Sequence, residues 1–487
     1  MSTEPAIPVR PLAGARPGDM RARLAQALAD PMLQTALGRA IPGFRRMRAS
    51  AVAEVPEWEV LRRLAAHIKD HTLAVLDRYL EQFEAAVRAR GGVVHWAADA
   101  AEAQRTIIDL LRALGVHQVV KSKSMVTEEI GLNAALEAAG VRVVETDLGE
   151  YVLQLAGEAP SHLIAPMIHK PIEAVSELFA VALGAPRYER AEDLNRVARA
   201  ALRREFLAAD AGITGVNFAV AETGTLVIVE NEGNARLVTS CPRVHVAVLG
   251  IEKLLPRLAD LGVFLRLLAR SATGQRASVY VSLLTGPRRS GEADGPDELH
   301  VVLVDNGRTR LLADPDLREA LRCIRCSACL NVCPVFERAG GHAYGSVYAG
   351  PIGAVLTPAL WGLRPARELP FASTLCGACG EVCPVSIDLP RLLLELRARV
   401  VREGLVGRPD RLFARLWTLV MRSPTRLTLF GALGRALQRL AVSEGRIDRL
   451  RGPLAGWTAH RAAPPLAAVP FRVRWRARGG RPGRGRP

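Results

Sequence analysis

Seven of the eight cysteines in this 487-residue chain lie in two short runs. The first run reads Cys323-x2-Cys326-x2-Cys329-x3-Cys333-Pro334, and the second reads Cys376-x2-Cys379-x3-Cys383-Pro384. Two-residue gaps let a short loop wrap three corners of one iron–sulfur cube, whereas the three-residue gap sends the last thiolate toward a second cluster. The proline after each run helps to stop the loop from continuing along the same path. The two runs therefore predict two iron–sulfur clusters.

The crossed ligand arrangement of two-cluster sites divides the seven thiolates unequally. It predicts a set of four and a set of three: Cys323, Cys326, Cys329 and Cys383 for the first cluster, and Cys333, Cys376 and Cys379 for the second. The missing thiolate belongs three residues before Cys376, where Ser373 stands. Three outcomes are open: Ser373 Oγ or water ligates the fourth iron, the cluster is a three-iron [3Fe-4S] form, or a nearby group supplies the ligand. An open iron would bind substrate or shift the potential.

Structural zinc is the main alternative, because zinc sites also use C-x2-C pairs. Zinc sites usually combine separated pairs with histidine, so the unbroken first run favours [4Fe-4S] clusters. Neither C-x-x-C pair is followed by histidine, which excludes covalently attached haem by pattern. The eighth cysteine is Cys241, in Thr239-Ser240-Cys241-Pro242. It is predicted to be a buried free thiol rather than a ligand or nucleophile.

Composition limits the compartment and the class of partner. A formal net charge of +16 favours acidic partners, anionic substrates or membrane surfaces. Clustered cysteines in a long chain indicate metal binding in a reducing compartment rather than a disulfide scaffold. Residues 1–20 lack the apolar segment of a secretory signal, and no window of about 18 uninterrupted apolar residues could cross a bilayer. We therefore expect a cytoplasmic protein.

Periodicity and composition divide the chain into five regions. We expect a leader with N-terminal helices at 1–44, an α/β domain at 45–310, a ferredoxin-type iron–sulfur domain at 311–395, a helical region at 396–465 and a disordered arginine-rich tail at 466–487. Helical spacing from 20 to 43 is broken at Pro31 and Pro42. One long amphipathic helix is predicted from 56 to 90. The cluster Arg45, Arg46 and Arg48 is interpreted as a solvated face rather than an anion site.

Alternating strand and helix patterns predict the fold of the second region. Strands are predicted at 93–96, 116–120 and 141–145, with helices at 98–114 and 127–139 between them. This βαβαβ order implies right-handed crossovers and a parallel sheet covered by helices. Further elements are expected as helices at 171–183 and 193–208, followed by strands at 224–230, 244–249, 277–283 and 300–305.

Three side chains of the α/β region are candidate substrate contacts. Lys121 and Lys123 follow a predicted strand and precede a helix, where an open α/β sheet binds anions; the alternative is surface charges paired with Glu128 and Glu129. Glu222 precedes a tight turn whose N–H groups either face a ligand or only shape the turn. His162 and His169 are interpreted as ordinary loop or helix-cap residues. No nucleophile–base pair or G-x-G-x-x-G fingerprint stands out, so the catalytic residues are unknown.

Two further segments are open to a functional and a plain interpretation. Glycines at 340–345 and 350–353 either line a cluster, with their N–H groups toward its sulfurs, or form ordinary turns. Residues 411–441 predict two basic amphipathic helices divided at Pro424, which pack on their own protein, dock on a partner or lie on a membrane surface. The tail lacks a folded nucleic-acid motif, so nucleic acid is not expected as a partner.

Several motifs together resemble the lactate utilization protein B family. They are the ferredoxin-type run, the run Ser373-x-x-Cys376-x-x-Cys379-x3-Cys383-Pro384, Lys121-Ser122-Lys123-Ser124-Met125, Glu145-Thr146-Asp147-Leu148-Gly149-Glu150, Ala221-Glu222-Thr223-Gly224-Thr225, and the Gly-His-Ala-Tyr-Gly and Gly-Pro-Ile-Gly-Ala segments. The resemblance covers roughly residues 20 to 465. It implies an α/β lactate-utilisation domain similar to the ribose-phosphate isomerase and CoA-transferase group, and the same two ligand sets.

The resemblance also implies a function. Such proteins work beside two other subunits in a complex that oxidises L-lactate to pyruvate, with this member as the iron–sulfur electron carrier to an acceptor that the sequence does not identify. One alternative is an oxidoreductase whose α/β domain binds a hydroxy acid or acyl compound, with chemistry at an open iron of the second cluster. Another is a zinc-stabilised interaction module without redox function.

Overall fold

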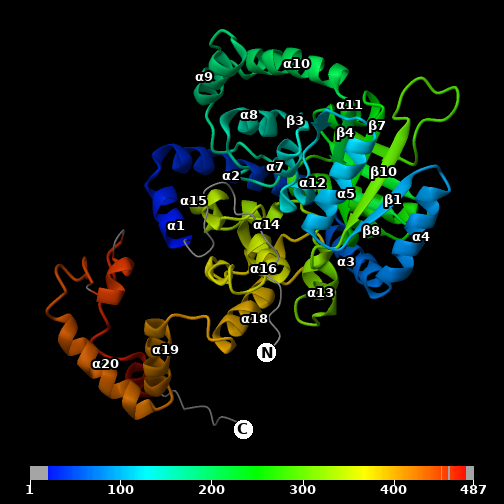
Figure 1. Ribbon diagram of the computed structural model, residues 1–487. Helices are drawn as coiled ribbons and strands as arrows, with labels where there is room; N and C mark the ends of the chain where they lie inside the picture. Colours follow the sequence, from blue (N-terminus) through cyan, green and yellow to red (C-terminus); the bar gives the residue numbers. More distant parts are fainter. Residues whose placement is uncertain (1–19, 451, 459–460, 479–487) are drawn as a thin grey trace. The chain divides into compact units, whose positions relative to one another are not determined.

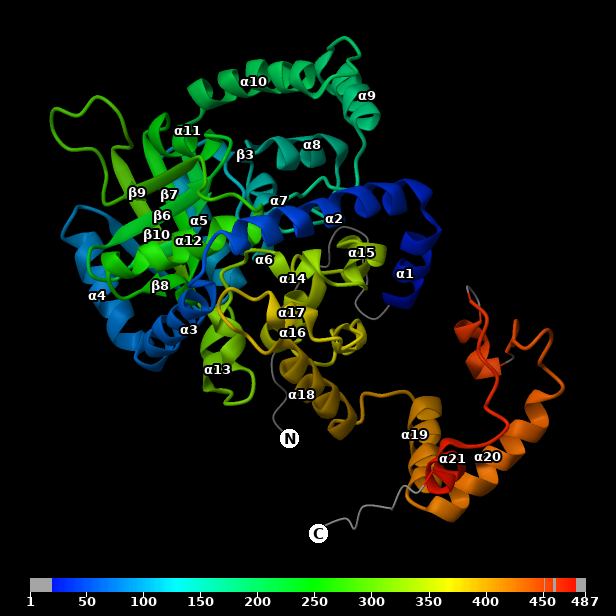
Figure 2. The same cartoon turned by 180° about the vertical axis from the view of Figure 1, so that it is seen from behind.

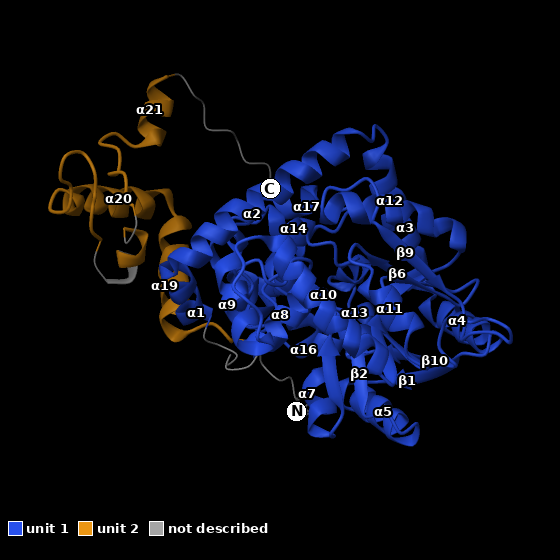
Figure 3. Cartoon of the chain, turned by 90° about the horizontal axis from the view of Figure 1, so that it is seen from above, with its two compact units in different colours: residues 1–403 blue, residues 404–487 orange. Residues whose placement is uncertain are grey.

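The computed structural model describes residues 20–450, 452–458 and 461–478, and it divides into two compact units (Figure 3). The first unit ends at Glu403 and contains the predicted α/β and iron–sulfur regions. The second unit begins at Gly404. The predicted domain boundaries at 310 and 395 fall inside the first unit and stay a prediction.

A six-stranded parallel sheet forms the centre of the α/β region (Figure 1). Its strands, in spatial order, are β1 (Val93–Ala97), β10 (Glu298–Val304), β7 (Val244–Gly250), β4 (Ala211–Gly215), β2 (Gln118–Lys121) and β3 (Arg142–Glu145). Every neighbouring pair is parallel, which confirms the predicted parallel sheet. All seven residues of β7 are buried, as expected for a strand that is covered on both faces.

Helices cover both faces of this sheet. α5 (Ala100–Ala113) and α7 (Leu132–Ala138) pack on the face that includes Val119 and Val143. On the opposite face, α8 (Leu148–Ala156), α10 (Ala191–Ala208) and α11 (Asn234–Ser240) pack against β2, β3 and β4, with Val120 and Val144 in their core. α9 (Ile172–Leu183) packs on α8 and α10. The helix predicted at 127–139 is instead α6 (Met125–Glu129) followed by α7, because Gly131 adopts a positive φ of 64° between them.

The strand order has a switch point between β2 and β4. These strands are neighbours, but the chain runs from β2 outward to β3 and from β4 in the opposite direction to β7. Connections that leave in opposite directions open a crevice beyond the carboxyl ends of the two strands. Lys123 follows β2 and Asn217 follows β4, so both lie at this crevice.

A second, four-stranded sheet lies beside the first (Figure 2). It has the order β8 (Leu254–Leu255), β5 (Phe218–Val220), β6 (Thr225–Glu230) and β9 (Tyr280–Leu284), and it packs with α12 (Leu261–Ala272) and the 3-10 helices η1 (Ile251–Lys253) and η2 (Leu258–Asp260). The long helix predicted at 56–90 is wrong. The chain forms α3 (Trp58–Ala74) and α4 (Leu76–Arg88), because Val75 leaves the helical region and lets α3 pack on α12 and β8 while α4 packs on β1.

The cysteine runs lie among short helices at the end of the first unit. These are α13 (Arg308–Ala313), η3 (Arg318–Arg322), α14 (Ala328–Asn331), α15 (Phe336–Ala339), η4 (His342–Tyr344), α16 (Gly350–Trp361), η5 (Leu369–Phe371), α17 (Ala378–Glu381) and α18 (Leu389–Arg402). The N-terminal helices α1 (Met20–Ala29) and α2 (Pro31–Ala53) pack on α14 and α15. The predicted break at Pro42 is wrong, since α2 continues through it. Leu37 and Ile41 of α2 are buried in the hydrophobic core of this unit, and their burial offsets the free-energy cost of a proline inside the helix.

The second unit contains α19 (Arg408–Met421), α20 (Pro424–Gln438), η6 (Gly452–Trp457) and α21 (Phe471–Ala477). α20 begins at Pro424, as predicted. Neither α19 nor α20 has a buried residue, although the two helices pack on each other within the second unit, and the choice among packing, partner docking and membrane contact stays a prediction. The tail was expected to be disordered, yet Phe471–Ala477 is helical because Phe471 and Trp475 stack on one helix face with ring centroids 5.8 Å apart. Residues 479–487 lie outside the described part. Within the described residues, no helix combines the length and apolarity needed to cross a bilayer.

We expect Gly341→Ala to destabilise the first unit. A Cβ built on Gly341 would lie 1.9 Å from the carbonyl oxygen of Ser161, so the backbone must shift, at a cost of about 3 kcal/mol. Gly38→Ala is the matched control, because a Cβ there meets nothing within 4 Å in the middle of α2. It should stabilise the helix by roughly 0.5–1 kcal/mol. Denaturant unfolding of both variants checks the difference, and equal stabilities would contradict it.

Candidate iron–sulfur sites and an adjoining cavity

Four cysteines that are separated by up to 60 positions line one small cavity. Cys323, Cys326, Cys329 and Cys383 surround it together with apolar side chains. Backbone N–H groups point at the sulfurs: that of Arg325 lies 3.4 Å from Cys323 Sγ, and that of Ile387 lies 3.4 Å from Cys383 Sγ. Arg325 has a positive φ of 60°, which turns its N–H inward. This cavity brings together the four thiols of the first predicted set.

The three remaining thiols form a second group. This group contains Cys333, Cys376 and Cys379. Burial is the main cause that raises the pKa of Cys333 and of Cys379, and neighbouring thiols of the same group raise both pKa values further. Cys376 is exposed, and a hydrogen bond from Thr374 lowers its pKa. Ser373 Oγ accepts the N–H of Leu375 at 3.1 Å. The hydroxyl that sequence spacing suggests as a fourth ligand therefore makes a local turn hydrogen bond here.

The chemistry of the donor groups fits iron–sulfur clusters. Burial raises the pKa of Cys383 to about 11, so its thiolate form needs a bound metal or nearby positive charge. Three cations with buried side chains interact electrostatically with Cys323, and the buried carboxylate of Glu252 lies among them: Lys69, Lys253 and Arg325. This surplus of positive charge suits a cluster that four thiolates make anionic.

A buried charge network connects the α/β region to the first cysteine run. Arg308 pairs with Glu129 at 2.8 Å and with Glu252 at 2.5 Å, and Arg325 pairs with Glu252 at 3.2 Å. Burial acts to raise the pKa of Glu252, but the attraction of Arg308 and Arg325 outweighs it and lowers the pKa to about 2. Tyr348 Oη donates to Glu129 at 2.6 Å. The loop of the first cysteine group is therefore held by the α/β region itself.

Arginines of the N-terminal helices were missed as contacts of the second run. Arg48 donates to the carbonyl oxygen of Val382 at 2.9 Å, and Arg62 donates to that of Cys383 at 2.8 Å. The interpretation of Arg48 as part of a solvated face is wrong, because its pKa is lowered first by burial and it also feels the Cys326 and Cys383 thiols. Local sequence carries no signal for this, since these residues are more than 300 positions from their partners.

The glycine segments divide between the two interpretations. Gly341 packs its backbone against Ser161 and serves the contact between the α/β region and the short helices. In the second segment, the N–H of Ile352 is hydrogen-bonded to the Cys329 thiol. Burial raises the pKa of Cys329, and this hydrogen bond opposes the rise. The second segment therefore supplies a backbone N–H to a predicted ligand, whereas the first reaches Cys333 and Cys329 through the buried Tyr344, whose pKa is raised first by burial and then by these thiols.

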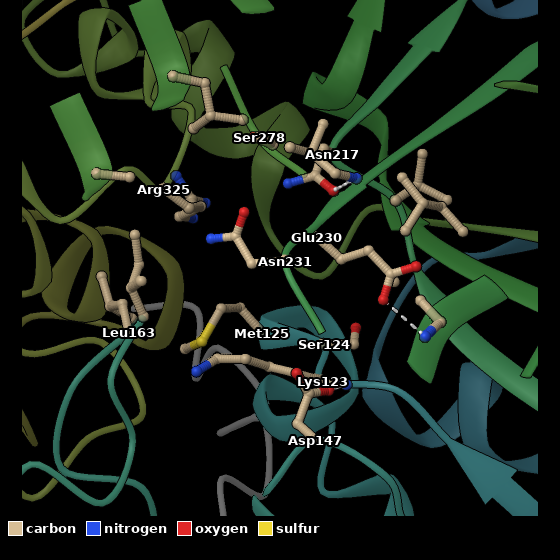
Figure 4. A pocket seen from close by; sticks show the side chains of 18 of the residues that line it. Lys123, Ser124, Met125, Asp147, Leu163, Asn217, Glu230, Asn231, Ser278 and Arg325 are labelled. Carbon is tan, nitrogen blue, oxygen red and sulfur yellow. Dashed lines mark hydrogen bonds between the residues drawn. The ribbon is translucent and has the colours of Figure 1, made fainter. Parts of the chain in front are cut away.

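A larger cavity of about 250 Å³ occupies the switch point of the parallel sheet. Its lining comes from the ends of β2 and β4, from the β6–α11 segment and from α12, and it includes Ile324 and Arg325 of the first cysteine run. Figure 4 shows Lys123 and Asp147 on one side of this space, Arg325 on another, and Asn231 between them. The cavity therefore lies between the α/β crevice and the loop of the first cysteine group, and no residue of the second run lines it.

The candidate substrate residues differ in their positions. Lys123 lines the cavity and pairs with Glu150 at 2.9 Å. Lys121 is fully buried below it, paired with Glu145 at 2.7 Å and with Glu128 at 3.2 Å. The alternative of surface charges is therefore wrong for Lys121, because the end of β2 is covered on both faces. The suggested partner Glu129 pairs with Arg308 instead.

Other predicted residues lie away from the cavity. Glu222 is exposed and accepts the N–H of Leu258 at 2.8 Å, so it shapes a turn. Cys241 is exposed and not buried as predicted, because α11 ends just before it. His162 is buried and its Nδ1 accepts the N–H groups of Ile164 and Ala165 at 3.1 and 3.0 Å, which agrees with a structural role.

Comparison with known proteins places these features in a family. The chain is 44% identical over 460 residues to lactate utilization protein B of Shouchella clausii, covering 94% of this chain and 96% of that protein. The chain belongs to the lactate utilization protein B family. The homologue from Geobacillus thermodenitrificans is 46% identical, over 89% of this chain and 92% of its own length. Escherichia coli YkgF, named an uncharacterized electron transport protein, is 41% identical over 93% of this chain and 95% of its own length.

The family models match both halves of the site. A LUD domain matches residues 80–304, which include the whole parallel sheet, and a 4Fe-4S dicluster domain matches residues 319–387, which include all seven clustered cysteines. This member of the lactate utilization protein B family therefore binds two iron–sulfur clusters. A DUF162 family protein from Deinococcus radiodurans is similar at 17% identity over 47% of this chain and 98% of its own, but its TM-score of 0.27 supports no argument about the fold.

Proposed function

We propose that this chain is the iron–sulfur electron-transfer subunit in the oxidation of L-lactate to pyruvate, acting beside two other lactate-utilisation subunits. The observation that carries the proposal is the gathering of seven cysteines into groups of four and three around a fold whose relatives are named for lactate utilisation and electron transport. We assign Cys323, Cys326, Cys329 and Cys383 to one cluster, and Cys333, Cys376 and Cys379 to the other. Bound iron–sulfur clusters accept and donate single electrons.

The two cysteine groups differ in their access to solvent. Cys326, Cys329 and Cys383 of the first group are less than one tenth exposed and lie beside the switch-point cavity. Cys333 and Cys379 of the second group are equally buried, but Cys376 is exposed, whereas the least buried thiol of the first group, Cys323, is half-buried. The exposed thiol supports the second group as the one that a redox partner approaches. In this proposal the second cluster lacks a fourth thiolate, so its fourth iron is ligated by Ser373 Oγ, by water or by a nearby group, or is absent in a [3Fe-4S] form.

The test uses the anaerobically purified full chain with the two partner subunits, L-lactate and a soluble electron acceptor. We expect lactate-dependent reduction of the chain, seen as the electron paramagnetic resonance signals of reduced clusters, and acceptor reduction that stops when the chain is omitted. Undiminished transfer from lactate to the acceptor without this chain would refute the proposal.

A second candidate function is an oxidoreductase whose α/β domain binds a hydroxy acid or acyl substrate. The switch-point cavity favours it, since this is where open α/β sheets bind ligands. Ile324 and Arg325 of the first cysteine run line the cavity, whereas residues 376–384 do not. This lining favours chemistry near the first run rather than at an open iron of the second cluster. Turnover of L-lactate with an artificial acceptor by the chain alone would favour this function over the first one.

The proposed fold similarity to the ribose-phosphate isomerase and CoA-transferase group rests on the family resemblance and on the parallel sheet with its switch point. Superposition of an experimental structure on members of that group is the test. A different strand order around the crevice would contradict it.

We expect the second unit to make peripheral contact with anionic membranes. Leu416, Trp417 and Phe430 are more than half exposed on α19 and α20, and arginines accompany them, which is the composition of an interfacial helix. The full chain should sediment with vesicles containing phosphatidylglycerol and not with pure phosphatidylcholine. Leu416→Glu should reduce sedimentation, whereas Val181→Glu, at an exposed position of α9, should not. Equal sedimentation of all three proteins would contradict this expectation.

A further inference from the structure

Among the residues that the structure describes, the switch-point cavity is lined by one cation without a direct hydrogen-bond or ion-pair partner. Lys253 lines the cavity, is only 8% exposed, and makes no hydrogen bond or ion pair with any residue that the structure describes. Burial, and next the positive charge of Arg325, lower the pKa of Lys253 to about 8, so it still carries a charge at neutral pH. Glu252 and Cys323 offset part of this charge, but none of the described carboxylates pairs with it directly, and a buried charge without a direct partner is costly, so the position favours an anion.

The acidic side chains of the cavity are already engaged elsewhere. Glu230 accepts the N–H groups of Ala235 and Arg236 at the start of α11, at 2.8 and 2.9 Å. Glu232 accepts the N–H of Leu148 at 3.0 Å, and Asp147 accepts the N–H of Lys123 at 2.7 Å. These carboxylates hold the loops around the cavity. None of the three forms an ion pair with Lys253, whose charge is offset in part by Glu252 and Cys323.

Arg325 supplies a second cation with spare hydrogen-bond donors. It donates to the carbonyl oxygen of Cys323 at 3.2 Å and to Glu252 at 3.2 Å, whereas a guanidinium has five N–H donors. Figure 4 shows its side chain at the cavity wall. Arg325 pairs with Glu252, which directly precedes Lys253 in the chain, and both Lys253 and Arg325 line the cavity, so the two cations lie near each other.

The size and remaining lining of the cavity limit the ligand. A volume of about 250 Å³ is below the range of roughly 300–1,000 Å³ for sites of drug-sized ligands, and it excludes a dinucleotide. Apolar side chains such as Ile228 and Leu268 line it beside the amides of Asn217 and Asn231. This combination suits a short chain with one charged end and one or two further oxygens.

We propose that this cavity binds a short-chain hydroxy or oxo carboxylate, with the carboxylate held between Lys253 and Arg325. The choice of L-lactate and pyruvate as its first probes rests on the proposed function. The Arg325 guanidinium lies 3.2 Å from the carbonyl oxygen of Cys323, so a carboxylate bound to it lies beside the first cysteine group. Added negative charge disfavours a reduced cluster, and the ligand should therefore lower the midpoint potential of the cluster held there.

The test is titration calorimetry on the anaerobic full chain with both clusters in place. L-lactate and pyruvate should bind at one saturable site, and the neutral analogue lactamide should not. Lys253→Gln should weaken carboxylate binding roughly 10- to 100-fold, as expected for loss of a charged hydrogen bond, whereas Lys253→Arg should stay near the parent protein. Lys170→Gln is the matched control, because Lys170 pairs with Glu158 and does not line the cavity.

Three results would overturn the proposal: no saturable carboxylate binding to the parent protein, equal binding by Lys253→Gln, or a Lys253→Gln variant whose only change is a ligand-independent shift of cluster potential. The last result would mean that Lys253 only balances the charge of the cluster. Ser278→Glu offers a second variant if Lys253→Gln loses its clusters, since Ser278 lines the cavity and a carboxylate there should abolish binding. Failure of carboxylate binding with intact, redox-active clusters would leave the electron-transfer function standing.

Discussion

Cys329→Ser and Cys383→Ser should remove the same cluster, although 54 positions separate them. Both thiols line the cavity of the first cysteine group, and a cube that loses a thiolate ligand is bound weakly or lost. We expect each variant to lose the same set of reduced-cluster resonances and about half of its iron, and to lose most of its electron transfer. Cys333→Ser and Cys379→Ser should remove the other set, because their thiols belong to the second group.

Electron paramagnetic resonance with iron and sulfide quantitation checks this assignment. Cys241→Ser is the matched control, since Cys241 is exposed and outside both groups, and it should keep both signals. The crossed assignment is wrong if Cys329→Ser and Cys383→Ser remove different signals. It is also wrong if Cys241→Ser removes either one.

Arg308→Met should be the most destabilising substitution in the charge network. Arg308 is 1% exposed and pairs with both Glu129 and Glu252, so its loss leaves Glu129 buried without its cationic partner and Glu252 paired with Arg325 alone. Removing one partner of a buried ion pair costs about 3–5 kcal/mol. Because Glu252 also holds Arg325 of the first cysteine run, we expect weaker cluster retention in the same variant.

Thermal unfolding and iron content under anaerobic conditions measure both effects. Arg276→Met is the control, because the pair of Arg276 with Glu54 is exposed to solvent, which screens it, and its midpoint should equal that of the parent protein. Adding Glu129→Gln to Arg308→Met should recover part of the stability, since one fewer buried charge then remains unpaired. An Arg308→Met variant as stable as the control would refute the role of the network.

The strand and helix pattern was predictable because it depends on neighbouring residues. The strands at 93–96, 141–145 and 244–249 are found as β1, β3 and β7, since buried strands have continuous apolar runs that are visible in the sequence. Errors occurred where packing overrode the local pattern. Apolar periodicity predicts one helix through Val75, but the helix breaks there. The α2 helix continues through Pro42, because the neighbouring residues Leu37 and Ile41 are buried.

Only part of the candidate site had a sequence signal. Lys123 was predicted near a ligand from its place after a strand, and it lines the cavity. Lys253 and Arg308 had no signal, because a single lysine or arginine in sequence resembles any surface charge. Their importance comes from burial and from partners such as Glu129, which lies 179 positions away from Arg308.

Cysteine spacing by itself determined that this chain holds two clusters, because ligand geometry depends on the few residues between successive thiols. Tertiary structure decided which surfaces meet those clusters. It placed the crevice of the parallel sheet against Arg325 of the first run and left Cys376 of the second run exposed. These positions depend on contacts between residues far apart in the chain, and the energies of such contacts are set by burial and by charge neutralisation, which spacing does not record.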